Sequence, residues 1–128
     1  MPDEKKKTVL LVEDDLFLSQ LLTTRLQRVN INVVKVFDGD EAMNTLKSIK
    51  PDLMLMDIIL PKKSGFEVME EINSNPTLQD GPIVVVSNLG QDADIARARA
   101  LGAVDYLIKA QTSIDDLVLK IQGFLNKV

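Results

Sequence analysis

The chain contains no cysteine, no histidine and no tryptophan. Without cysteine, it can form no disulfide bond, no thiolate metal site and no cysteine nucleophile. Without histidine, serine–histidine catalysis and zinc–histidine sites are excluded as well. The reactive groups that remain are carboxylates, lysine amines and hydroxyls, so any chemistry must be carried by these groups.

Long apolar stretches and an excess of positive charge are also missing. No run approaches the roughly 20 residues of a transmembrane helix, and the run after the charged N-terminus is too short for a signal peptide. The formal net charge of -4 argues against general nucleic-acid binding. We therefore expect a cytoplasmic protein with no direct contact to membranes or nucleic acid. Its 128 residues, 45% of them apolar, fit a single domain over residues 1–128, with residues 1–7 as a flexible charged N-terminus.

Five short apolar runs alternate with stretches of helical periodicity. The runs cover residues 9–12, 33–37, 53–56, 83–86 and 106–108. Asp38 and Ser64, each with a glutamate three residues on, predict capped helix starts, Ser113 opens a last helix, and Gly102 ends the one that begins at Asp92. Such alternation is typical of a parallel sheet covered by helices on both faces. We predict an α/β, flavodoxin-like fold with a five-stranded parallel sheet in the order 2-1-3-4-5 and five helices.

Two of the apolar runs end in acidic residues. Glu13, Asp14 and Asp15 follow the first run, and Asp57 follows the third. In the predicted order these strands are neighbours at the topological switch point, so the carboxylates converge there. At about 4 Å and an effective dielectric of about 20, each like-charge pair costs roughly 4 kcal/mol, which indicates a cation site. Mg²⁺ suits the set, because it uses one or two carboxylates plus a phosphate. Taken singly, each of these residues reads as an ordinary turn or capping residue, with Asp15 capping the first helix.

A hydroxyl and an amine follow the fourth and fifth strands. Ser87 ends the fourth run and Lys109 follows the fifth. Either residue alone reads more simply as a cap or a solvated charge. Together with Asp57 and a metal they supply what in-line phosphoryl transfer to an aspartate requires: a carboxylate nucleophile, a hydroxyl donor and an ammonium for the phosphoryl oxygens.

With these positions in place, the chain resembles the receiver domain of two-component response regulators, of the stand-alone kind similar to the chemotaxis regulator. The resemblance covers essentially the whole chain, including Pro61 and Gly65 of the loop after the third strand. It implies the following roles: Asp57 as phosphoacceptor; Asp14, Asp57 and the backbone carbonyl of Ile59 as metal ligands, with Glu13 acting through water; Ser87 and Lys109 as phosphoryl contacts; Tyr106 as the switch aromatic.

The resemblance also implies the function. A sensor histidine kinase or a phosphotransfer protein passes a phosphoryl group to Asp57 with Mg²⁺, for which Mn²⁺ can substitute, and the changed surface then acts on a downstream protein. The module assists its own phosphorylation and slow dephosphorylation and is not a turnover enzyme. The sequence names neither the kinase nor the target.

Two positions depart from the family pattern. Ala110 follows Lys109 where the family usually has a proline joined by a cis bond. A cis non-proline bond costs roughly 3 to 4 kcal/mol, yet we expect the Lys109–Ala110 bond to be cis, because the phosphoryl contact constrains the lysine. Asn88 stands where a small residue usually follows the switch hydroxyl, and it narrows access to the site.

The lifetime of the phosphoryl group is expected to depend on Ile59 and Leu89. Family members that lose the group quickly tend to place polar side chains two residues after the phosphoacceptor and two after the switch hydroxyl. Here both positions are apolar and bulky. They form a gate that excludes the attacking water, so the sequence predicts slow dephosphorylation.

Three other functions are weaker interpretations. A phosphatase of the haloacid-dehalogenase kind needs a second aspartate two residues after its nucleophile, and Ile59 occupies that place. A flavodoxin-type electron carrier needs a hydroxyl- and glycine-rich phosphate loop after the first strand, but the chain has acidic residues there that would repel an anionic cofactor. A receiver without phosphorylation is disfavoured, because all five expected positions are filled.

Overall fold

The protein's structure, a computed structural model, describes residues 6–126 and contains a sheet of five parallel strands. The strands are β1 (Thr8–Val12), β2 (Asn32–Val36), β3 (Leu53–Met56), β4 (Ile83–Ser87) and β5 (Asp105–Ile108). Their order is β2-β1-β3-β4-β5, which confirms the predicted topology. Only β3 matches its predicted range at both ends; β1, β4 and β5 differ by one residue at one end, and β2 differs by one residue at each end. Phe37, for example, lies outside β2, because its N–H donates to the Glu41 side chain at 3.2 Å instead of to the sheet.

Five helices connect and follow the strands, as predicted. They are α1 (Leu16–Arg28), α2 (Gly39–Leu46), α3 (Gly65–Ser74), α4 (Asp92–Ala100) and α5 (Ile114–Leu125), with short 3-10 turns at Pro76–Leu78 and Lys109–Gln111. Asp15, Asp38, Ser64 and Ser113 each accept a hydrogen bond from an N–H in the first turn of the helix that follows. Of the two predicted capping boxes, the one at Ser64 is complete, whereas the partner of Asp38, Glu41, accepts from Phe37 instead. The sequence therefore places every helix start correctly.

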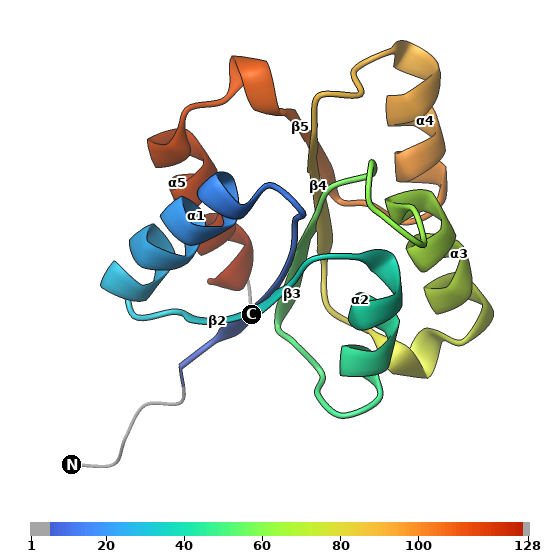
Figure 1. Cartoon of the computed structure of the whole chain (residues 1–128), viewed down its shortest axis with the longest axis horizontal. Coiled ribbons are helices and arrows are strands. Elements are labelled where there is room, and N and C mark those ends of the chain that lie inside the picture. Colours follow the sequence, from blue (N-terminus) through green and yellow to red (C-terminus); the bar gives the residue numbers. More distant parts are fainter. Residues whose placement is uncertain (1–5, 127–128) are drawn as a thin grey trace.

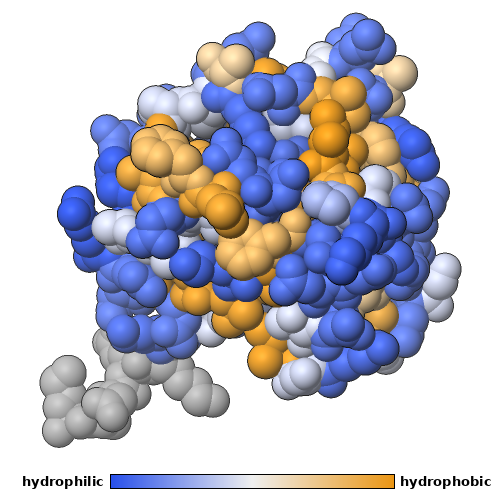
Figure 2. Space-filling view, viewed as in Figure 1, coloured by the Kyte–Doolittle hydropathy of each residue, from blue (hydrophilic) through white to orange (hydrophobic). Residues whose placement is uncertain are grey.

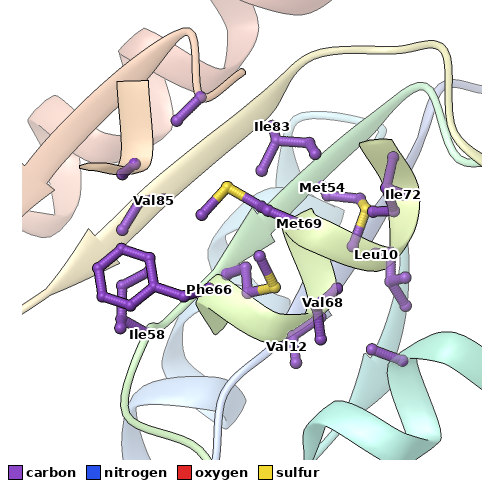
Figure 3. Close-up of a cluster of buried hydrophobic side chains, with 14 of the residues drawn as sticks. Leu10, Val12, Met54, Ile58, Phe66, Val68, Met69, Ile72, Ile83 and Val85 are labelled. Atoms are coloured by element: carbon purple, nitrogen blue, oxygen red, sulfur yellow. The ribbon is translucent and has the colours of Figure 1, made fainter. Parts of the chain in front are cut away.

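The three central strands, β1, β3 and β4, are buried on both faces and almost entirely apolar, whereas the edge strand β2 exposes Asn32 and Lys35. Alternate residues of β1 point to opposite sides: Leu10 and Val12 pack in a cluster with residues of α2, α3 and α4, whereas Val9 and Leu11 pack with residues of α1 and α5. Figure 1 shows these two layers of helices on either side of the sheet. Figure 3 shows the first cluster, where side chains of α3 lie against those of β1, β3 and β4. Helices therefore pack on both faces of the sheet, whose carboxyl edge carries the candidate site.

The N-terminal prediction is tested only in part. Residues 1–5 of the expected flexible segment lie outside the described residues. Lys7 is held in place, because its carbonyl accepts a hydrogen bond from Asn32 N–H at 2.9 Å. Within residues 6–126, no helix has the length and apolar character needed to cross a membrane.

Candidate functional site

Glu13 and Asp57 lie side by side at the carboxyl edge of the sheet. The Asp57 N–H donates to the carbonyl of Val12 at 3.0 Å, and the Glu13 N–H donates to the carbonyl of Val36 at 3.1 Å. Glu13 thus continues the backbone hydrogen bonding one residue past the end of β1, and Asp57 continues it one residue past the end of β3. This backbone pairing, set by the strand order, brings together acidic residues that are 44 positions apart along the chain, as the sequence predicts.

The loop after Asp57 folds back tightly on that residue. Gly65 N–H donates to the carbonyl of Ile58 at 2.8 Å, and a Cβ at position 65 would lie 2.5 Å from the carbonyl oxygen of Asp57. Only glycine fits such an approach without moving the backbone. The Ile59 N–H donates to Oδ1 of Asp57 at 3.2 Å, so the loop also orients the carboxylate.

Lys109 reaches across the site and bridges the two buried carboxylates. Its Nζ lies 2.6 Å from Oδ2 of Asp57 and 2.8 Å from Oε1 of Glu13. The Glu13 side chain is fully buried and that of Asp57 is 7% exposed. The other oxygen of Glu13, Oε2, accepts from Asp15 N–H at 3.1 Å. The sequence places all three residues at this edge, but it does not predict that Lys109 itself neutralises the pair.

Burial and ion pairing oppose each other in this cluster. Burial raises the pKa of Glu13 above its ordinary value, against the lowering effect of the hydrogen bond from Lys109. For Lys109, burial alone would lower the pKa, but hydrogen bonds to Asp57 and Glu13 outweigh it, so the pKa lies above its ordinary value. The amine therefore stays charged and compensates carboxylates that would otherwise be buried and unpaired.

The carboxylates form a set that can hold a hard cation. One oxygen each from Glu13, Asp14 and Asp57 lie within 4.8 Å of one another, and Asp14 is exposed. Oxygen ligands on one open side match Mg²⁺, which keeps several of its waters. The carbonyl of Ile59 as a further ligand stays a prediction. An ion bound here would share Asp57 and Glu13 with Lys109.

Ser87 and Tyr106 meet at the backbone of Leu89. Ser87 is fully buried and its Oγ accepts from Leu89 N–H at 3.2 Å. The Tyr106 hydroxyl donates to the carbonyl of Leu89 and also contacts Ser87. Tyr106 is only 8% exposed, and burial raises the pKa of its phenol. The aromatic side chain therefore already points inward and holds the loop after β4.

The expectation of a cis bond after Lys109 is wrong. The Lys109–Ala110 bond is trans, and a 3-10 turn begins at Lys109. Ala110, unlike proline, carries an N–H, and this group donates to Oδ1 of Asn88 at 3.0 Å. Lys109 reaches both carboxylates from the trans geometry, so the cost of a cis bond is avoided. Asn88 is exposed and directed at the next loop.

Comparison with known proteins agrees with this geometry. Residues 9–122 match the response regulator receiver domain family, which is most of the chain. The chain belongs to that family. This confirms the resemblance stated from the sequence: the chain is a receiver domain of two-component response regulators.

Relatives of the receiver domain include regulators and solved receiver structures. A probable transcriptional regulator from Guillardia theta is 38% identical over 97% of this chain and 47% of its own length. The phosphorylated cyanobacterial phytochrome response regulator RcpA has a TM-score of 0.84 at 34% identity, covering 97% of both chains. The Mn²⁺-bound response regulator Rcp1 has a TM-score of 0.83 at 32% identity, covering 95% of this chain and 96% of its own. The receiver domain spans about half the length of the curated relatives it matches.

Removing the Lys109 amine should destabilise the metal-free protein. Lys109→Met leaves Glu13 and Asp57 buried without a counter-charge, so we expect the free energy of unfolding to fall by about 3 kcal/mol. Chemical denaturation with a chelator present measures this change, and added Mg²⁺ should restore part of the loss. Lys47→Met, at an exposed lysine of α2's C-terminal end, is the matched control and should change little.

Asp14→Asn should act in the opposite direction. It removes one negative charge from the cluster without unpairing Lys109, so the melting temperature of the metal-free protein should rise while Mg²⁺ binding weakens. Thermal unfolding and calorimetric titration with Mg²⁺ measure the two effects. A clear loss of stability in Asp14→Asn would instead mark this residue as a structural cap.

Proposed function

We propose that this receiver domain accepts a phosphoryl group on Asp57 and thereby changes its binding surface. The observation that carries the proposal is the position of the Asp57 carboxylate, held between the Lys109 amine and the Ile59 N–H at the edge of the sheet. The neighbouring carboxylates of Glu13 and Asp14 supply a cation site within reach of the same group. No other cluster of metal-ligating carboxylates occurs in residues 6–126.

The proposed transfer follows from these contacts. A carboxylate oxygen of Asp57 attacks the phosphorus, and the bond from phosphorus to the donor breaks, with the electron pair leaving on the donor imidazole. The Lys109 ammonium donates a hydrogen bond to one phosphoryl oxygen, and the Ser87 hydroxyl donates to another. A bound Mg²⁺ or Mn²⁺ ion supplies further positive charge to these oxygens. The domain assists its own phosphorylation in this way and performs no turnover on a separate substrate.

Ser87 and Tyr106 are the proposed switch. Ser87 Oγ is held by Leu89 N–H, and the Tyr106 hydroxyl is held by the Leu89 carbonyl, so one residue's backbone joins both side chains. When Ser87 turns to a phosphoryl oxygen, its bond with Leu89 weakens and the loop before α4 rearranges. The surface formed by this loop, α4 and β5 is then presented differently to a downstream protein.

Exposed apolar side chains beside the site are the proposed contact for the phosphodonor, a sensor histidine kinase or phosphotransfer protein. Leu16 and Phe17, in the first turn of α1, are 67% and 79% exposed, and Ile59 is 60% exposed. Figure 2 shows hydrophobic surface over α1, next to hydrophilic surface. Apolar residues around a polar site are typical of protein-binding surfaces. A donor histidine must approach Asp57 past these side chains.

Phosphorylation should require both Asp57 and a divalent cation. After treatment with acetyl phosphate and Mg²⁺, the intact mass should rise by one phosphoryl group. The increase should be absent with chelator and absent in Asp57→Asn, since the amide is not a nucleophile. A full adduct on Asp57→Asn would overturn the assignment.

Phe17→Ala should separate donor docking from chemistry. We expect transfer from a kinase or phosphotransfer protein to slow by roughly tenfold, the effect of losing about 1.4 kcal/mol of interface contact. Transfer from acetyl phosphate should be unchanged, because this small donor does not need the surface. Leu119→Ala, at an α5 residue that is 65% exposed, is the control for a general loss of surface apolarity. Equal slowing with both donors would contradict the docking role.

The apolar gate formed by Ile59 and Leu89 should make the phosphoryl group long-lived. Ile59→Asn combined with Leu89→Glu provides polar groups that can orient a water for attack on the phosphorus, so dephosphorylation should accelerate. Decay of the phosphorylated mass after removal of the donor measures the rate. Loss of the phosphoryl group within seconds in the unmodified protein, or no change in the double variant, would show that the gate does not control the lifetime.

A further inference from the structure

Asn88 and Ala110 form a contact between two loops at the site's edge. The Ala110 N–H donates to Oδ1 of Asn88 at 3.0 Å across 22 positions of sequence. Asn88 comes directly after β4, and Ala110 lies two residues after β5. The last pair between these two strands is Ser87 with Ile108. Figure 1 shows the two loops leaving the same edge of the sheet. The contact therefore continues the pairing of β4 and β5 past the end of the strands by means of a side chain.

These two residues are the positions at which the sequence departs from the receiver pattern. A proline at position 110 would have no N–H to donate. An alanine or glycine at position 88 would have no side-chain oxygen to accept one. Each substitution thus supplies the half of a hydrogen bond that the other requires, and one contact accounts for both departures.

The contact lies next to two residues that act near Asp57, namely Lys109 and Leu89. Lys109 lies between the end of β5 and Ala110, and the hydrogen bond within its turn, from Thr112 N–H to the Lys109 carbonyl, is long at 3.4 Å. On the other loop, Leu89 follows Asn88 and accepts from the Tyr106 hydroxyl. Fixing Ala110 to Asn88 restrains the backbone of Lys109 on its C-terminal side and restrains Leu89 on its N-terminal side.

We propose that Asn88 is a positioning residue, which holds Lys109 at Asp57 and keeps Tyr106 inward by tying the loop after β4 to the loop after β5. In this chain the hydrogen bond between Asn88 and Ala110 orients Lys109, whose peptide bond to Ala110 is trans. The inference deepens the proposed function, because it concerns the lysine that would contact the phosphoryl oxygens. It also predicts a property of the unphosphorylated protein that can be measured separately.

Asn88→Leu tests the proposal, because leucine keeps the branched shape of asparagine and removes the acceptor. Amide hydrogen exchange at Ala110 should accelerate, and the phenol of Tyr106 should titrate closer to its ordinary pKa as the side chain becomes more exposed. Tyr106 is the sole tyrosine and there is no tryptophan, so absorbance and emission report on this residue without interference. Phosphorylation by acetyl phosphate should slow by roughly two- to tenfold, the effect of losing one net hydrogen bond.

Two further variants make the result specific. Asn88→Asp retains an acceptor oxygen, so the slow exchange of Ala110 and the inward Tyr106 should be preserved. Asn44→Leu, at an exposed asparagine of α2, should leave all three measurements unchanged. Unchanged Tyr106 titration and unchanged phosphorylation in Asn88→Leu would overturn the proposal, even if Ala110 exchange accelerates. If no variant takes up a phosphoryl group, the proposed function fails, and the Ala110 and Tyr106 measurements still decide the role of Asn88.

Discussion

The ion cluster of Lys109 with Glu13 and Asp57 is the interaction on which the site depends. Two buried carboxylates at neighbouring strand ends would repel each other strongly in the low dielectric of the protein interior. The Lys109 amine, at 2.6 and 2.8 Å, compensates both of them. A buried pair of this kind contributes little net stability, but losing one partner is costly. The three charges are thus balanced only when all of them are present, and a cation or phosphoryl group that binds one of them changes the contacts of the other two.

The strand order by itself brings the residues of this cluster together. Placing β1 beside β3 brings Glu13 next to Asp57, and placing β4 and β5 beyond β3 brings Ser87 and Lys109 to the same edge. The helices bury both faces of the sheet and fix the strand ends, while the loops leave Asp14 exposed to solvent. The strand ends therefore set the positions of the charged groups, and the Asn88 side chain ties together the loops that carry Leu89 and Ala110.

The sequence predicts most of the fold and the membership of the site. Continuous apolar runs identify the strands, and an acidic or basic residue directly after a run, such as Asp57 or Lys109, identifies the edge. What the sequence does not predict is pairing between side chains of distant segments. The bridge from Lys109 to Glu13 depends on side-chain reach, and the hydrogen bond from Ala110 N–H to Asn88 joins two loops that are 22 positions apart. The trans bond at Ala110 is the ordinary geometry of a non-proline residue, which the prediction should have preferred. Two departures from the family pattern beside one site, at Asn88 and Ala110, are a signal in the sequence that the two residues contact each other.

Locating the phosphoryl group on the chain tests the central claim most directly. Reduction of the phosphorylated protein with borohydride converts an aspartyl phosphate to homoserine, and peptide mass mapping then identifies the residue. We predict homoserine at position 57 in protein treated with acetyl phosphate and Mg²⁺, and unmodified aspartate there when chelator is present. Homoserine at Asp14 or Asp38 with position 57 unmodified, or no modified aspartate at all, would contradict the account.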